Sequence, residues 1–161
     1  MRQFLTGLFF LFSATTYGQT TTQNDSISFC SYNFKAPTGC TTEKNNNIKC
    51  DNYEIGWTYM NEVNANGASD DQKLKGMENS FIEMGGMLDK FKKKRITCYL
   101  LDKEVKGYKV RYKSATNVTY QVYASGIING QGVSVILTLN KEPITNDDIP
   151  EFPRQIIRLT K

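Results

Sequence analysis

The sequence contains no histidine, and this absence limits the chemistry that the chain could perform. Imidazole is the commonest general base and a common metal ligand, and it ordinarily titrates near neutral pH. Catalysis would instead need a carboxylate pair, or a Ser or Cys nucleophile activated by another group. Neither Ser125 nor Ser134 lies in a Gly-x-Ser-x-Gly turn, the local structure that exposes a serine nucleophile. A carboxylate pair is therefore the remaining candidate for a general acid and a general base.

Three carboxylate pairs lie close together in the sequence, and each has an ordinary structural explanation. They are Glu78 with Glu83, Asp147 with Asp148, and Asp51 with Glu54. The first pair lies on the outer side of an expected helix, the second at a helix cap and the third beside a turn. We therefore predict no catalytic residues.

Two further patterns could hold a ligand but have simpler interpretations. The three glycines between Gly126 and Gly132 lie between two expected strands, which indicates a hairpin turn at Asn129-Gly130 and not a phosphate cradle. The run 146–148 does not have the spacing of a calcium loop. We predict no cofactor and no metal.

The first 18 residues have the pattern of an export signal. Arg2 gives a positive start, the stretch from Phe4 to Phe12 is almost entirely apolar, and Gly18 precedes a cut ahead of Gln19. The apolar stretch is shorter than the roughly 20 residues of a retained membrane helix. We therefore expect an exported protein, periplasmic or secreted, with no transmembrane segment after signal removal. The expected parts are a signal peptide at 1–18, a flexible lead-in at 19–26 and a single α+β domain at 27–161.

In an exported protein we expect the four cysteines to form disulfides, because disulfides persist in oxidising compartments. The cysteines are Cys30, Cys40, Cys50 and Cys98. Three pairings are possible, and we favour Cys40 with Cys50, which would close a loop, leaving Cys30 with Cys98. One disulfide with two buried thiols is the alternative. The spacings match no zinc pattern, and such a site would have to be all-thiolate.

The hydrophobic pattern predicts an antiparallel sheet of about six strands with two helices packed on it. Apolar residues recur every three or four positions over 70–91, which predicts a central amphipathic helix whose C-terminal dipole accommodates the basic run 90–95. A second helix is expected over 149–159. Strands are predicted at 27–34, 53–59, 96–101, 108–112, 119–128 and 133–139, with Trp57 facing the core.

Polar residues alternate with apolar ones on the later strands, which predicts that one sheet face stays partly in water. We take Lys109, Arg111, Lys113, Gln121 and Tyr123 as a candidate face for a partner. The basic residues favour an unknown protein or acidic ligand as the partner. The formal net charge of +4 is too small to indicate nucleic-acid binding.

The order of elements resembles the Mog1 and PsbP-like α+β fold. The resemblance rests on Asn33-Phe34-Lys35-Ala36-Pro37 near the start and on Asp148-Ile149-Pro150-Glu151-Phe152, which leads into an apolar helix. The resemblance implies a binding or accessory role, and it assigns no site residues to this chain. The signal followed by Gln19 and a Thr-rich stretch resembles exported proteins of the Bacteroidota. A cystatin-like fold is the alternative, but its Gln-x-Val-x-Gly motif is absent.

These observations favour an exported, non-catalytic binding or accessory protein of the cell envelope. An immunity protein or inhibitor that neutralises a toxin or protease is the alternative. A carboxylate-dependent hydrolase is the second alternative, and a deep pocket that holds two carboxylates would favour it.

Overall fold

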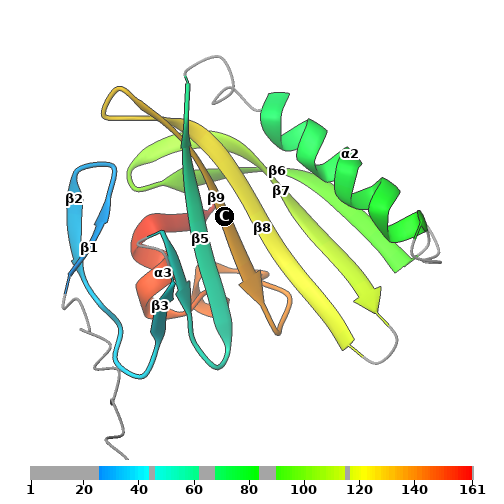
Figure 1. The fold of residues 1–161 in the computed structure, drawn as a ribbon, viewed down its shortest axis with the longest axis horizontal. Helices are drawn as coiled ribbons and strands as arrows, with labels where there is room; N and C mark the ends of the chain where they lie inside the picture. The colour runs from blue at the N-terminus through cyan, green and yellow to red at the C-terminus, as the bar shows by residue number, and fades with distance from the viewer. Residues whose placement is uncertain (1–25, 44–45, 62–67, 84–89, 115–116, 161) are drawn as a thin grey trace, which may run out of the picture.

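The computed structural model describes residues 26–43, 46–61, 68–83, 90–114 and 117–160. Its main element is an antiparallel sheet of eight strands in the order β10-β6-β7-β8-β9-β5-β4-β3 (Figure 1). In chain order these strands are β3 (Thr41–Glu43), β4 (Asn47–Lys49), β5 (Tyr53–Met60), β6 (Phe91–Leu100), β7 (Lys103–Ser114), β8 (Asn117–Ile128), β9 (Gln131–Leu139) and β10 (Ile157–Leu159). The predicted α+β class is confirmed at this coarse level, whereas the strand number is larger than predicted. The expected signal peptide lies outside the described residues.

A separate hairpin replaces the first predicted strand. The segment 27–34 forms β1 (Ser26–Phe29) and β2 (Tyr32–Lys35), which pair with each other. Cys30 and Ser31 make the turn with φ of 48° and 71°, in the left-handed region where few non-glycine residues lie. The apolar positions change phase at this turn, from Ile27 and Phe29 to Tyr32 and Phe34, and the prediction of one continuous strand overlooked this change.

The central helix is shorter than predicted, and the basic run belongs to a strand. Helix α2 spans Ala68–Glu83, and β6 begins at Phe91. Leu74 and Met77 of the predicted apolar stripe pack against the sheet, while Met84 and Leu88 lie outside the described residues. The explanation of the basic run as a helix C-terminus is therefore wrong. All of its residues except Lys90 lie on β6, where side chains point alternately to the two faces of the sheet.

The end of the chain is also a mixture of elements and not one helix. A 3-10 turn, η2 (Asn146–Asp148), precedes the short helix α3 (Glu151–Ile156), and the chain then enters β10. Ile149, Phe152, Ile156 and Leu159 are nevertheless buried together in one core, as their spacing predicts. A short helix followed by a strand therefore produces the same spacing of buried residues as one continuous helix would.

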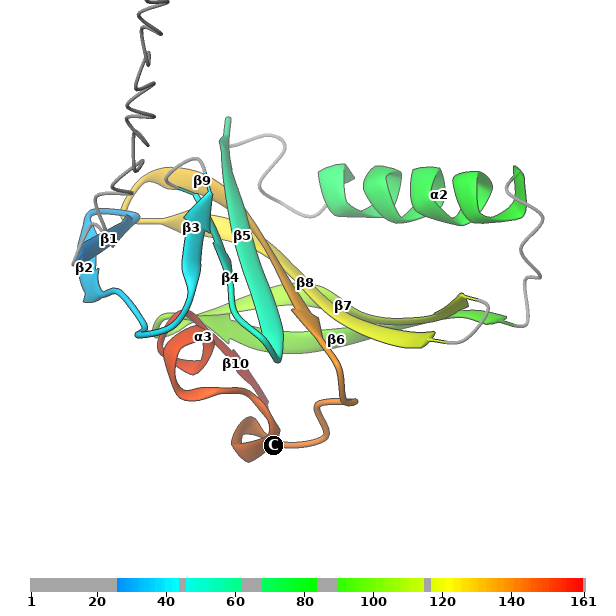
Figure 2. The same ribbon diagram turned by 60° about the horizontal axis from the view of Figure 1, so that its bottom comes forward.

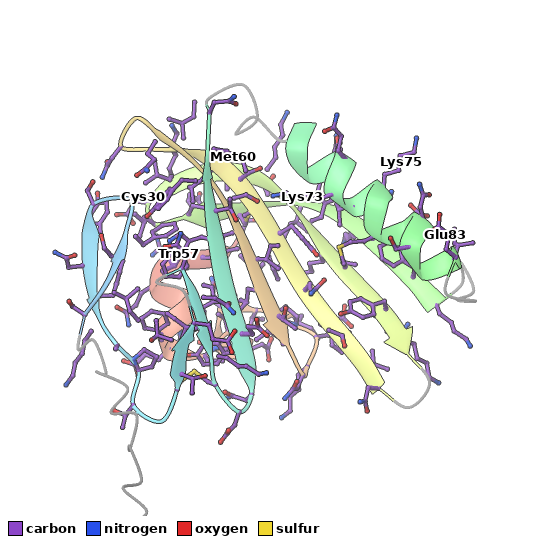
Figure 3. The ribbon with its side chains drawn as sticks, in the orientation of Figure 1. Cys30, Trp57, Met60, Lys73, Lys75 and Glu83 are labelled. Atoms are coloured by element: carbon purple, nitrogen blue, oxygen red, sulfur yellow. A yellow bond between two sulfur atoms is a disulfide. The ribbon has the colours of Figure 1, made fainter. Side chains whose placement is uncertain are left out.

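The sheet carries a core on each of its two faces. The main core joins alternate residues of the strands with α3 and the β1–β2 hairpin, and it includes Trp57, whose ring meets that of Phe29 edge to face at 5.6 Å. A smaller core on the opposite face holds Leu74 of α2 against Val110 and Tyr123. Figure 3 shows Cys30 and Trp57 in the half of the molecule that holds the main core, with α2 at the other end.

The Asn129-Gly130 hairpin turn is confirmed. It joins β8 to β9, and the two residues have φ of 50° and 75°, as a tight type I′ turn requires. Another two-residue turn, Leu101-Asp102, joins β6 to β7 where a longer turn had been predicted. These short connections fix the register of the meander, and the register decides which side chains share a face.

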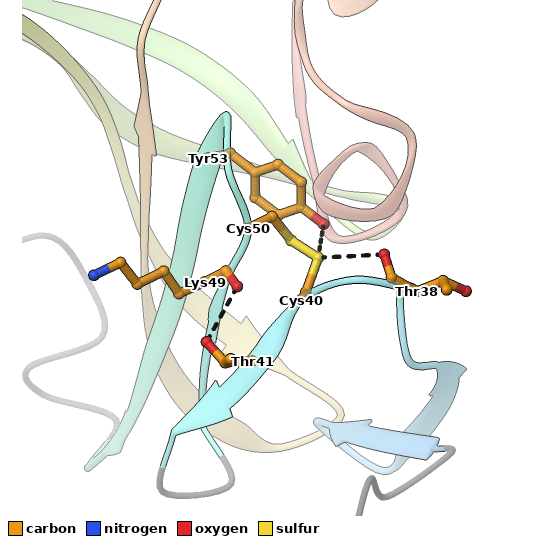
Figure 4. Close-up of a disulfide and its surroundings, with 6 residues drawn as sticks. All are labelled: Thr38, Cys40, Thr41, Lys49, Cys50 and Tyr53. Atoms are coloured by element: carbon orange, nitrogen blue, oxygen red, sulfur yellow. Dashed lines mark hydrogen bonds between the residues drawn. A yellow bond between two sulfur atoms is a disulfide. The ribbon is translucent and has the colours of Figure 1, made fainter.

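The preferred disulfide is present, and the second predicted one is not. Cys40, just before β3, and Cys50, just after β4, are bonded, with Cα atoms 4.4 Å apart (Figure 4). Cys30 and Cys98 are buried thiols. Cys30 sits in the hairpin turn beside Asn129, which donates to its carbonyl oxygen, whereas Cys98 lies on β6 against Val105. Burial raises the pKa of Cys30 to about 11, so its thiol stays protonated near neutral pH.

Removal of the disulfide by Cys40→Ser and Cys50→Ser together should lower the free energy of unfolding by about 2 to 3 kcal/mol, because the bond restricts the unfolded chain over a ten-residue separation. Urea unfolding of the oxidised parent and of the double variant measures this difference. Reductant should destabilise the parent and leave the double variant unchanged. A difference below about 1 kcal/mol would contradict the stabilising role.

Candidate functional site

The strand register places five basic side chains on one face of the sheet. They lie at alternate positions on two neighbouring strands: Lys92 and Lys94 on β6, and Lys109, Arg111 and Lys113 on β7. We call these five residues the basic face. Figure 2 shows this end of β6, β7 and β8 extending under α2, which covers the opposite side of the sheet.

The basic face is the outward continuation of the main core. Cys98 and Val105 are paired across β6 and β7 and belong to the main core, and alternation carries the same side to Lys94 and Lys109. The core elements α3 and β1–β2 lie at the other end of the sheet (Figure 2). Lys92, Lys94 and Lys113 are exposed, and Lys109 and Arg111 are half-buried. Long basic side chains thus replace apolar ones where the core ends.

Like charges oppose each other directly across this face. Lys92 lies opposite Arg111, and Lys94 lies opposite Lys109. Like charges in directly opposed positions destabilise a sheet, on a scale of up to about 1 kcal/mol per pair. None of the ion pairs found among the described residues includes a member of the basic face. The stability of the fold does not account for this accumulation of charge.

The other two basic residues of this part of β6, Lys93 and Arg95, are paired with acidic side chains. Lys93 Nζ lies 3.1 Å from Glu78, and Arg95 lies 3.6 Å from Asp71, both on α2. These side chains point to the α2 face because they alternate with those of the basic face. Helix α2 therefore balances one half of the basic run and leaves the other half to solvent.

Lys109 also has a structural role. Its ammonium group donates a hydrogen bond to the carbonyl oxygen of Pro143, in the loop that follows β9. Burial lowers its pKa, the charge of Glu142 opposes this shift, and nearby Lys94 adds to it. Lys109 therefore anchors the loop, and the other four residues are better positions for testing the basic face.

The structure divides the predicted partner face between the two sides of the sheet. Lys109 of β7 pairs with Val122 of β8, so Gln121 and Tyr123 point the other way. Tyr123 is buried beneath α2, where its hydroxyl lies 2.7 Å from Met77 Sδ and 2.9 Å from Gln121 Oε1. The prediction that all five residues form one face is wrong, because the register pairs odd-numbered positions of β7 with even-numbered positions of β8.

Lys92 and Lys94 are the site residues that sequence reasoning missed. All four residues of 92–95 are basic, so no apolar alternation extends the strand predicted from Ile96 back to these two lysines. The apparent continuation of the apolar stripe to Phe91 favoured a helix instead. The choice of element decided whether these two lysines could join the residues of β7.

The carboxylates of the three pairs have structural partners or lie in solvent, but Glu78 faces β6 and not the outer side of the helix as predicted. Glu78 is paired with Lys93, and Asp147 is paired with Arg154 at 3.1 Å. Asp148 accepts the backbone N–H groups of Thr145 and Ile144 at 2.7 and 2.9 Å, which holds its pKa below the ordinary value. Glu54 accepts a hydrogen bond from Asn47, whereas Asp51 and Glu83 are exposed.

A cavity of about 700 Å³ lies between the disulfide loop and α3. Its lining includes Asp51 and Glu151, whose side chains are both exposed. Tyr53 lies at the wall with its hydroxyl 3.9 Å from Cys40 Sγ, and burial raises its pKa to about 12. Solvated carboxylates lack the low-polarity surroundings that tune a general acid, so this cavity is a weaker candidate than the basic face.

Within the described ranges, no group of three or more Cys, Asp or Glu side chains could hold a metal ion. In the same part of the chain, no helix has the length and apolar character needed to cross a membrane.

Comparison with known proteins adds no further candidate. No family model, curated protein or solved structure matches the chain. The likeness to the Mog1 and PsbP-like fold therefore stays a prediction. The assignment of function rests on the geometry and charge of the basic face.

Proposed function

We propose that the chain is an exported, non-catalytic binding or accessory protein of the cell envelope, and that the basic face binds an acidic partner. The observation that carries this proposal is the two pairs of opposed like charges, Lys92 with Arg111 and Lys94 with Lys109. An acidic surface placed against them replaces repulsion by attraction. Repulsion that destabilises the free chain and is relieved when a partner binds is typical of a binding surface.

Two further features support the proposal. The expected signal peptide and the Cys40–Cys50 disulfide both fit an oxidising compartment. The carboxylates predicted as possible acid and base pairs are occupied by backbone groups, by amides or by basic side chains, or lie in solvent. A binding role therefore requires only the residues of the basic face.

Affinity capture from the native envelope or culture fluid tests this function. The bait is the chain without residues 1–18, and the variant replaces Lys92, Lys94 and Lys113 by alanine. The partner should bind the parent, elute as salt is raised and bind the variant about tenfold more weakly, because exposed interface charges contribute modestly and are screened. Its identity is read by mass spectrometry.

A matched control separates position from net charge. Lys35, Lys49 and Lys75 are exposed lysines on β2, β4 and α2, and their replacement by alanine removes the same charge. This triple variant should capture the partner as the parent does. Equal capture by all three proteins, or equal loss in both variants, would contradict the assignment to the basic face.

A further inference from the structure

Strand β6 has an open outer edge beside the basic face. On one side it pairs with β7 along its whole length, but on the other side β10 pairs with its last three residues, Cys98 to Leu100. Among the described residues, no strand pairs with the outer side between Lys92 and Ile96. This stretch is a sheet edge with backbone groups available for another strand.

The hydrogen bonds at the end of β10 show which backbone groups point outward. The hydroxyl of Thr160 donates to the carbonyl oxygen of Thr97 at 2.7 Å, so Thr97 directs its backbone away from β7. In an antiparallel sheet, alternate residues direct both N–H and C=O to the same side. Arg95 and Lys93 therefore present their N–H and C=O groups to the open edge.

Positively charged side chains and outward-directed backbone groups lie side by side at this edge. The side chains of Lys92 and Lys94 flank the outward backbone groups of Lys93 and belong to the basic face. An added strand with acidic residues at every second position would place those carboxylates beside Lys92 and Lys94. The same strand would accept and donate hydrogen bonds at Lys93 and Arg95.

Edge protection and self-association both explain the pattern less well. Lysines on an edge strand discourage pairing with other strands, which would account for Lys92 and Lys94. It does not account for Arg111 and Lys113, which lie on β7 inside the sheet. Pairing of β6 with β6 of a second copy would oppose one basic run to another, which is unfavourable.

We propose, resting on the binding role above, that the partner contributes an extended acidic segment that adds as a further strand to the outer edge of β6 between Lys92 and Ile96, with alternate carboxylates against the basic face.

Peptides of defined sequence test this proposal without knowledge of the natural partner. The probe is a short, end-capped peptide of alternating Glu and Thr with a fluorescent label, and its binding to the chain without residues 1–18 is followed by anisotropy. A peptide of the same composition with its Glu residues in one block has the same charge but cannot place every carboxylate on one side. It should bind about tenfold more weakly, since alternate side chains of an added strand give the specificity.

N-methylation shows whether the backbone takes part. One isomer carries N-methyl groups on the Thr residues and the other on the Glu residues, so each blocks one edge of the peptide strand. We expect one isomer to lose at least about tenfold in affinity and the other to bind like the parent peptide. Loss in the Thr isomer indicates antiparallel addition, and loss in the Glu isomer indicates parallel addition.

The remaining outcomes overturn the strand addition. If both isomers bind like the parent peptide, or both fail, the peptide does not pair along one edge. If no peptide binds while the captured partner still depends on Lys92, Lys94 and Lys113, the strand addition fails and the binding role stands. If capture is also independent of these residues, the proposed function itself fails.

Discussion

Replacing Lys92, Lys94 and Lys113 by glutamate should weaken binding of the acidic partner by about 100-fold or more and should make the chain more stable at low salt. The loss of affinity follows because three attractive contacts become repulsive, and juxtaposed like charges at an interface cost several kcal/mol. The gain in stability follows because Lys92→Glu faces Arg111 and Lys94→Glu faces Lys109. Each exchange of a like pair for an opposite pair is worth about 0.5 to 1 kcal/mol. Surface plasmon resonance and urea unfolding measure the two effects.

The opposite signs of these two effects distinguish a binding surface from a structural one. If the basic face served only the fold, reversal of its charges would lower stability and leave affinity unchanged. Both effects should shrink as salt is raised from low to physiological concentration, since ions screen exposed charges within about 8 Å. The corresponding glutamate variant at Lys35, Lys49 and Lys75 controls for net charge, and it should retain the affinity of the parent.

Gly107→Ala should lower the free energy of unfolding by about 3 kcal/mol, at the upper end of what overpacking of a core costs. A Cβ atom at this position would lie 2.3 Å from the carbonyl oxygen of Tyr123 and 3.1 Å from Cys98 Sγ. The first contact is with backbone, so relief requires β7 and β8 to separate. Thermal and urea unfolding with circular dichroism provide the measurement.

A second glycine supplies the control for this variant. Gly76 lies within α2, and a Cβ there would meet nothing within 4 Å. Gly76→Ala should therefore stabilise the chain by about 0.5 to 1 kcal/mol through the helix propensity of alanine. If Gly107→Ala were as well tolerated as Gly76→Ala, the close approach of β7 and β8 would be incorrect, and the register that assembles the basic face would be incorrect with it.

Local sequence patterns were sufficient to predict several elements of the structure. Apolar residues at alternate positions of β5 and β9 and the Asn129-Gly130 turn predicted strands and a hairpin that the structure contains. The Cys40–Cys50 bond followed from a loop that needed closure. These features depend on neighbours in sequence, and the sequence therefore contains what is needed to predict them.

Features that depend on distant contacts were predicted poorly. The run 92–95 has no apolar alternation because one of its sides lies beyond the main core, so nothing local distinguished a strand from a helix end. Similarly, Lys109 and Gln121 were expected on one face because both interrupt apolar positions. Their separation depends on the pairing of β7 with β8, and register is set by turn length and packing.

Hydrogen exchange on the complex of the chain with its captured partner tests whether the partner pairs with the outer edge of β6. Amide protons at Lys93 and Arg95 point to the open edge of β6 and should exchange fast in the free chain. On binding, these two amides should become protected, while the residues that line the cavity with Asp51 and Glu151 should keep their exchange rates. Protection at the cavity or along α2, with unchanged exchange in β6 and β7, would contradict it.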